Sequence, residues 1–152
     1  MSGSAFRFRL ERVRAVRERK EKLAQRDLAD AISRRSSSAA EVREADASLE
    51  HAHDEQRTIA AGRETVSATD LLARQAFLER VEAQRRIRVS ELEQRDAEVA
   101  ERDAELAAAA SEHEMLNRLR ERHRGEHNLE VARREVGVLD EIAAARFRGS
   151  RA

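Results

Sequence analysis

Gly62-Arg63-Glu64-Thr65-Val66-Ser67-Ala68-Thr69-Asp70-Leu71 is the stretch that divides this chain into two long segments. Gly62 suits the position just after a helix, where a left-handed backbone is needed. Ser67 suits a helix N-cap with Asp70 three residues later, a variant of the capping box. The stretch therefore predicts a turn at about 62–67, between a helix at about 4–61 and a helix at about 68–147.

Nothing in the sequence on either side of this turn ends a helix. The chain has 152 residues with no Pro and five Gly, and the segments 4–61 and 63–124 contain neither residue type. Charged residues make up 39% of the chain and aromatic residues 3%, which is typical of long helices or a coiled coil and too few rings for a globular core. Thirty basic and thirty acidic side chains, with aliphatic residues throughout, argue against disorder.

Both predicted helices carry an apolar stripe at heptad spacing. The stripes include Leu28, Ala31, Val42, Leu49 and Ile59 in the first helix and Leu71, Leu78, Leu92, Val99 and Leu106 in the second, with His113 at a later seam position. A short turn makes the helices antiparallel, so we expect one all-α domain over 1–152, an antiparallel two-helix coiled-coil hairpin. Facing residue numbers should add up to about 130, as for Leu23 with Leu106 and Ile32 with Val99.

The second helix is the longer one, and it is expected to overhang at its C-terminal end. Phe6 should lie opposite residues 123–124, which leaves 125–147 without a partner in the chain. This overhang keeps an apolar stripe of its own, made of Leu129, Ala132, Val136, Leu139, Ile142, Ala143 and Phe147. Such a face fits an external partner, with back-folding or fraying at Gly125 or Gly137 as the alternative.

The sequence offers little for catalysis. His123, Glu126 and His127 match the H-x-x-E-H pattern of inverted zinc peptidases, but a third ligand and an enclosing cleft are missing, so we interpret these residues as a solvated helix face. Without cysteine there is no thiolate metal site. We expect no catalytic residue, no metal and no cofactor, and the protein is predicted not to be an enzyme.

The first predicted helix begins with a basic segment. Its cations are Arg7, Arg9, Arg12, Arg14, Arg17, Arg19, Lys20 and Lys22, interleaved with Glu11, Glu18 and Glu21. A basic helix can grip phosphates, but the interleaved carboxylates and the absence of Tyr and Trp favour an acidic protein partner or a solvated face. The longest apolar run, 106–110, is far too short to span a bilayer, so a cytoplasmic protein is expected.

Three ordered stretches resemble one family. The first stretch runs from Phe6-Arg-Phe8-Arg-Leu10 through Arg17 to Leu28-Ala29. The second runs from Gly62 through Val66-Ser67-Ala68 to Phe77-Leu78-Glu79-Arg80-Val81-Glu82. The third runs from Leu119 through His123 to Leu139-Asp140-Glu141-Ile142-Ala143. Together they cover nearly the whole chain and are similar to the FliJ family of flagellar export proteins, whose neighbours are the injectisome stalk proteins. One departure is the absence of Tyr, which that family commonly carries near the turn.

The resemblance implies a stalk, similar to the γ subunit of rotary ATPases, that links the ring of the export ATPase to the FlhA-type export gate. The implied partners are the export ATPase ring and its regulator, the cytoplasmic domain of the gate, and export chaperones, at the inner membrane of the flagellar base. It assigns Phe77 and Val81 to the gate side. It assigns to the ATPase side Phe6, Phe8, Leu10, Leu139, Ile142 and Phe147.

Phe77 is also a recognition candidate on its own pattern. It precedes the seam residue Leu78 by one position, so much of its ring should face outward. The alternative is a ring lying flat along its own helix. For the protein as a whole, a generic structural coiled-coil tether and a basic-helix nucleic-acid binder are the alternative functions, although we expect no nucleic-acid partner.

Overall fold

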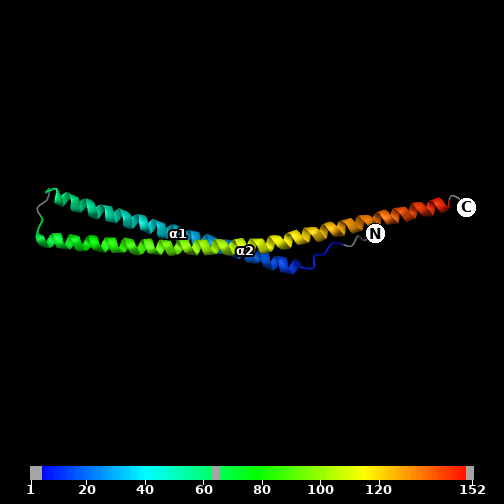
Figure 1. Cartoon of the computed structure of the whole chain (residues 1–152), viewed down its shortest axis with the longest axis horizontal. Coiled ribbons are helices and arrows are strands. Elements are labelled where there is room, and N and C mark those ends of the chain that lie inside the picture. The colour runs from blue at the N-terminus through cyan, green and yellow to red at the C-terminus, as the bar shows by residue number, and fades with distance from the viewer. Residues whose placement is uncertain (1–4, 63–65, 150–152) are drawn as a thin grey trace. The chain divides into compact units, whose positions relative to one another are not determined.

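The structure, a computed structural model, describes residues 5–62 and 66–149, and this part of the chain is built from two α-helices without a strand (Figure 1). Helix α1 runs over Glu11–Ala60 and has 50 residues, and α2 runs over Ala68–Gly149 and has 82. The helices pack against each other, and the second is longer. The predicted all-α hairpin is therefore confirmed.

Both described ends of the turn are capped as the sequence predicts. Gly62 has a φ of 70°, and its N–H donates to the carbonyl of Ile59 at 2.9 Å, which closes the last turn of α1. The Asp70 N–H donates to Ser67 Oγ at 3.1 Å, and the Ser67 N–H donates to the Asp70 carboxylate at 3.3 Å. This reciprocal pair completes the capping box. Residues 63–65 of the predicted turn lie outside the described residues.

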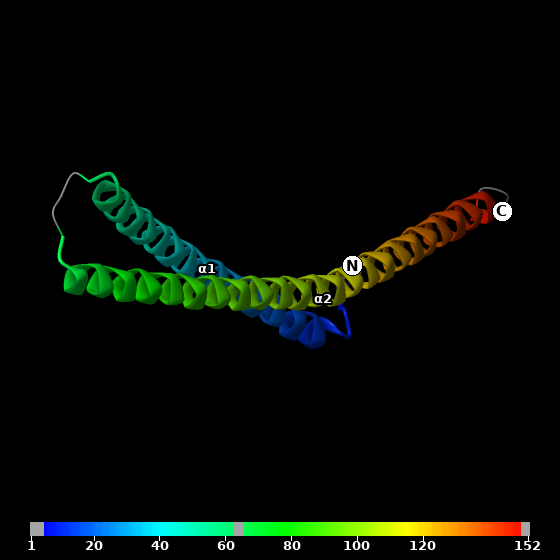
Figure 2. The same ribbon diagram turned by 60° about the vertical axis from the view of Figure 1, so that its left-hand side comes forward.

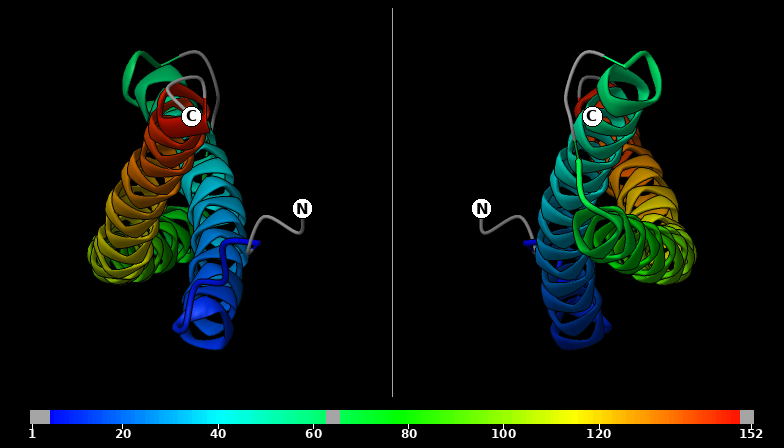
Figure 3. Two further views of the ribbon diagram at one scale, coloured as in Figure 1. Left: turned by 90° about the vertical axis from the view of Figure 1, so that its right-hand side faces the viewer. Right: turned by 90° about the vertical axis from the view of Figure 1, so that its left-hand side faces the viewer.

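Helix α1 begins at Glu11, whereas the sequence predicts a start near residue 4. Residues 5–8 form no regular secondary structure and are drawn as the thin blue segment in Figure 3. The ring of Phe8 lies 5.9 Å from that of His123, and the ring of Phe6 lies 5.7 Å from that of His127. Phe6 and Phe8 are two residues apart in extended chain, which spans about 6.6 Å. His123 and His127 are four residues apart in a helix, which spans about 6 Å, so each Phe ring can lie beside one histidine.

The expected position of Phe6 opposite residues 123–124 was therefore wrong. An extended chain covers more length per residue than a helix, and this moves Phe6 one helical turn further along α2, to His127. Phe8 takes the place opposite His123 instead.

The chain divides into two compact units. The terminal unit combines 1–22 with 108–152, and the turn unit is 23–107. Ion pairs between the helices fix the register within each unit. In the turn unit they are Arg34–Glu98 at 2.5 Å, Arg35–Asp96 at 2.5 Å and Arg88–Glu41 at 2.8 Å. In the terminal unit they are Arg17–Glu112 at 2.7 Å and Arg120–Glu11 at 3.5 Å. The two residue numbers of each pair add up to between 129 and 132, which confirms the predicted register. The single domain stays a prediction.

Small side chains dominate the buried positions. Among the described residues these are Phe8, Ala24, Ala31, Ala52, Leu78 and Ala109. Leu23 and Ile32, expected to face Leu106 and Val99, lie beside the seam instead, since they are 57% and 49% exposed. The inward positions belong to Ala31, a residue of the predicted stripe, and to Ala24, which lies one heptad before it and therefore shares its face.

In the terminal unit α2 continues well beyond the start of α1, as the orange and red part of the ribbon in Figure 2 shows. Every residue from 132 to 149 is exposed. We call residues 128–149 the C-terminal arm. The predicted C-terminal overhang is confirmed, and its apolar side chains are accessible.

Candidate partner-binding surfaces

Phe77 and Val81 line one groove in the turn unit. The groove is formed by Glu41, Glu44, Ala45 and Ser48 of α1 with Phe77, Val81, Gln84 and Arg88 of α2. Phe77 is 44% exposed and Val81 is half-buried. Since side chains of both helices line this groove, the Phe77 ring forms part of a surface shared by α1 and α2 and remains accessible to a partner.

The charges around this groove are only partly compensated. Arg88 lies 2.8 Å from the carboxylates of both Glu91 and Glu41. The hydrogen bond to Glu91 and then the charge of Glu41 raise the pKa of Arg88 above its ordinary value. Glu44 has no ion pair within the described residues. The groove thus offers apolar surface next to a carboxylate, which suits a partner carrying an apolar side chain beside a basic one.

The segment before α1 forms a second surface, in the terminal unit. Phe8 is buried to 9% exposure and Leu10 is 39% exposed. A hollow here is lined by Phe6, Arg7, Phe8, Arg9, Glu11, Arg12 and Arg120. Arg14 donates to Glu11 and lowers the pKa of that carboxyl, and Arg120 lies 3.5 Å from the same group. Arg7, Arg9 and Arg12 take part in no ion pair of the described residues, so the surface is basic.

This non-helical segment was missed from the sequence, although a signal was present. Residues 6–10 alternate between large apolar side chains and arginine. Such a period of two is typical of extended chain and not of a helix. Phe6 and Phe8 accordingly contact α2 while Arg7 and Arg9 are exposed.

A polar network joins the helices in the terminal unit. His113 Nδ1 lies 2.6 Å from the carboxylate of Glu21, and His113 Nε2 lies 3.3 Å from the side-chain nitrogen of Asn117. Arg14 donates to the oxygen of the same amide at 3.4 Å. These contacts are mutually consistent when Nδ1 carries the imidazole proton and Nε2 accepts from Asn117. His113 thus occupies its predicted seam position as a bridging polar group.

The structure separates the residues assigned to the ATPase side into two sets. Phe6 and Phe8 contact the α2 histidines, so the buried ring of Phe8 anchors the segment and offers little free surface. Leu139, Ile142 and Phe147 lie on the C-terminal arm and are 64%, 46% and 64% exposed. Leu10, the remaining assigned residue, is 39% exposed, so the most exposed of the assigned residues lie on the arm.

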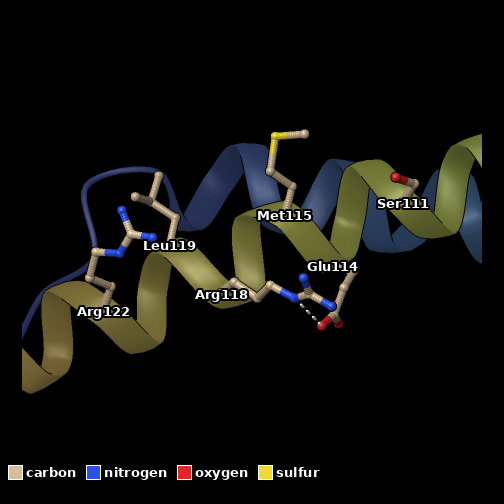
Figure 4. A pocket seen from close by; sticks show the side chains of 6 residues that line it. All are labelled: Ser111, Glu114, Met115, Arg118, Leu119 and Arg122. Atoms are coloured by element: carbon tan, nitrogen blue, oxygen red, sulfur yellow. Dashed lines mark hydrogen bonds and ion pairs between the residues drawn. The ribbon is translucent and has the colours of Figure 1, made fainter.

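A further groove on α2 contains residues that the sequence did not single out. It is lined by Ser111, Glu114, Met115, Arg118, Leu119 and Arg122 (Figure 4). Met115 projects away from the ribbon and is 67% exposed, while Arg118 donates to Glu114 at 2.9 Å. The sequence signal that could have indicated this groove is Met115, an unbranched apolar residue outside the heptad stripe.

The possible metal pattern has a different structural role. His127 and His123 contact the rings of Phe6 and Phe8. Within residues 5–62 and 66–149, no group of three acidic, histidine or cysteine side chains could hold a metal ion. In the same residues neither helix includes a stretch apolar and long enough to traverse a bilayer.

Comparison with known proteins gives one match. The family model described as Flagellar FliJ protein matches residues 6–152, nearly the entire chain. Searches of the curated proteins and of the solved structures each gave no match.

Proposed function

Because the chain belongs to the FliJ family of flagellar export-related coiled-coil proteins, we propose that it is the stalk that links the export ATPase ring to the export gate and escorts export chaperones. The single observation that carries this proposal is the family match over residues 6–152 of a two-helix hairpin. On this proposal the protein is cytoplasmic and associates peripherally with the inner membrane at the flagellar base.

The groove around Phe77 supports a gate-binding role for the turn unit. An accessible aromatic ring, the half-buried Val81 and the carboxylate of Glu44 together provide an anchor for a protein partner. Exposed aromatic residues in such positions often supply a large share of binding energy. The cytoplasmic domain of an FlhA-type gate is the proposed occupant.

The terminal unit supports the ATPase-binding role. It combines the exposed Leu139 and Ile142 of the arm with the basic surface around Arg7, Arg9 and Arg12. Apolar contact from the arm and charge from the basic surface would suit the lumen of the ATPase ring, with the regulator of the ATPase as an accessory partner.

A pull-down against the export ATPase and the gate cytoplasmic domain tests the proposal. Both proteins should be retained by the wild-type chain. Retention of neither would favour a generic structural tether. Strong, salt-dependent binding of DNA without retention of either protein would favour the nucleic-acid alternative, because phosphate binding by arginine weakens steeply with salt.

Substitution Phe77→Ala tests the gate side directly. Removing an anchor ring should weaken gate binding about 10-fold or more, which corresponds to the loss of a binding hot spot. The measurement is titration calorimetry, with circular dichroism to show unchanged helicity.

The matched control is Ile87→Ala, another large apolar residue of α2 that is 53% exposed and lies outside the groove. It should bind the gate like wild type. Gate binding by the Phe77 variant equal to that of the Ile87 variant would remove Phe77 from the proposed surface.

A further inference from the structure

The C-terminal arm carries a seam of its own. Leu129, Ala132, Val136, Leu139 and Ala143 follow one another at alternating spacings of three and four residues, which is the heptad pattern of a coiled coil. Leu129, Val136 and Leu139 are 61%, 57% and 64% exposed. The arm therefore has the pattern of a coiled-coil helix whose seam is accessible in the terminal unit.

Charged residues border this seam without being neutralised. Arg133 and Asp140 lie on one side of it at the same heptad position, and Glu135 lies on the other side. None of the three takes part in an ion pair of the described residues, whereas Arg134, outside the seam, is paired with Glu130. These three charges are available to a helix that packs on the seam.

A parallel pair of arms would be unfavourable. In a parallel coiled coil each residue of the seam faces its own copy, so Arg146, the next seam position, would meet Arg146 of the second chain. Glu135 would also lie near Asp140 of the second chain. Like charges are brought together at both places.

An antiparallel pair removes both conflicts. With a twofold axis between Val136 and Leu139, Val136 packs on Leu139 of the second chain, Ala132 on Ala143, and Leu129 on the aliphatic stem of Arg146. Arg133 then faces Asp140 of the second chain, and symmetry forms this ion pair twice. The small alanine side chains allow the two helices to approach closely.

We propose that two copies of this chain associate through their C-terminal arms, as a symmetric antiparallel coiled coil held by the seam around Val136 and Leu139 and by reciprocal Arg133–Asp140 ion pairs. This inference does not rest on the proposed function, because it concerns the chain alone. The pairing of the arms has a consequence for the proposed function, since a partner that binds Leu139 and Ile142 must first separate the two arms.

Sedimentation equilibrium of the full chain tests the pairing. Wild type should show a reversible monomer–dimer equilibrium. Substitution Asp140→Arg places two arginines together in the antiparallel dimer and should raise the dissociation constant about fivefold, and Arg133→Asp should do the same. The double variant R133D/D140R should return it to within about twofold of wild type.

Substitution Glu141→Arg is the matched control, because it changes the net charge by the same amount at an exposed position off the seam. It should leave the dissociation constant unchanged. A wild-type chain that stays monomeric at every concentration overturns the proposal. A tighter dimer for D140R also overturns it, because a parallel pair would place the new arginine near Glu135 of the second chain.

Disulfide trapping tests the orientation separately, since the chain contains no cysteine. When Val136→Cys and Leu139→Cys variants are mixed and oxidised, the disulfide between the two different variants should predominate. Predominance of disulfides between identical variants would instead indicate a parallel pair. Circular dichroism of each variant checks that the helices are retained.

Discussion

At the scale of single residues, two short-range interactions define where the chain turns. Gly62 adopts a left-handed backbone conformation at no steric cost, and Ser67 and Asp70 satisfy each other's backbone N–H groups at the start of α2. Both involve residues no more than three positions apart. Such contacts depend hardly at all on the rest of the fold.

Replacement of the N-cap residue, Ser67→Ala, should lower the free energy of unfolding by roughly 1 kcal/mol, because an N–H of the first helical turn loses its acceptor. Urea denaturation followed by circular dichroism measures this. Ser90→Ala, at an exposed position within α2, is the control and should change the stability by less than about 0.5 kcal/mol. An equal loss in both variants would contradict the capping role.

Asp70 should make a pH-dependent contribution. Hydrogen bonds from the Ser67 hydroxyl, and then from the Ser67 backbone, lower the pKa of Asp70. A folded-state pKa below the unfolded one means that the stabilisation is present above the unfolded value and is lost as the pH falls through the folded value.

The difference in melting temperature between wild type and Asp70→Asn should therefore be largest near neutral pH and shrink below about pH 4. A series of thermal melts by circular dichroism gives this difference. A constant difference down to pH 2 would show that the Asp70 charge does not matter to the cap.

At the scale of the helices, the interface is built mainly from alanine. Ala31 and Ala109 are each only 1% exposed, while Leu23 lies largely in solvent. Little apolar area is buried per residue by such an interface, so its stability depends on close approach of the backbones and not on large side chains.

Enlarging a buried alanine should therefore be harmful. Ala31→Leu is expected to lower the free energy of unfolding by about 1–3 kcal/mol, because the larger side chain forces the helices apart. Chemical denaturation measures the change. The control is Ala29→Leu, two residues away and exposed, which should have little effect. Stabilisation by Ala31→Leu would mean that the seam has unused space.

At the scale of the whole molecule, we expect the hairpin and the arm to have separate tasks. In the terminal unit the ring contact between Phe6 and α2 lies at His127, and α2 is exposed from residue 132 onward. Folding of the hairpin should therefore not need the arm.

Deletion of residues 129–152 should separate these tasks. The melting temperature of the hairpin should change by no more than a few degrees, whereas stimulation of the export ATPase should be abolished, which is measured as ATP turnover with and without the chain. The full-length variant Leu139→Asp is a control for chain length and should also lose stimulation. Undiminished stimulation by the deletion variant would reject the arm as the ATPase-binding surface.

The sequence by itself determined the two helices, the capped turn and the register, because glycine, the capping box and heptad spacing act over a few residues, and the turn then sets which residues face one another. The heptad stripe also predicted the inward position of Ala31, whereas the burial of Ala24 instead of Leu23 was decided only by the tertiary structure, since it depends on how two whole helices pack. The late start of α1 has both origins. The alternation of residues 6–10 favours extended chain, and the contacts of Phe6 and Phe8 with His127 and His123, more than a hundred residues away, stabilise it there.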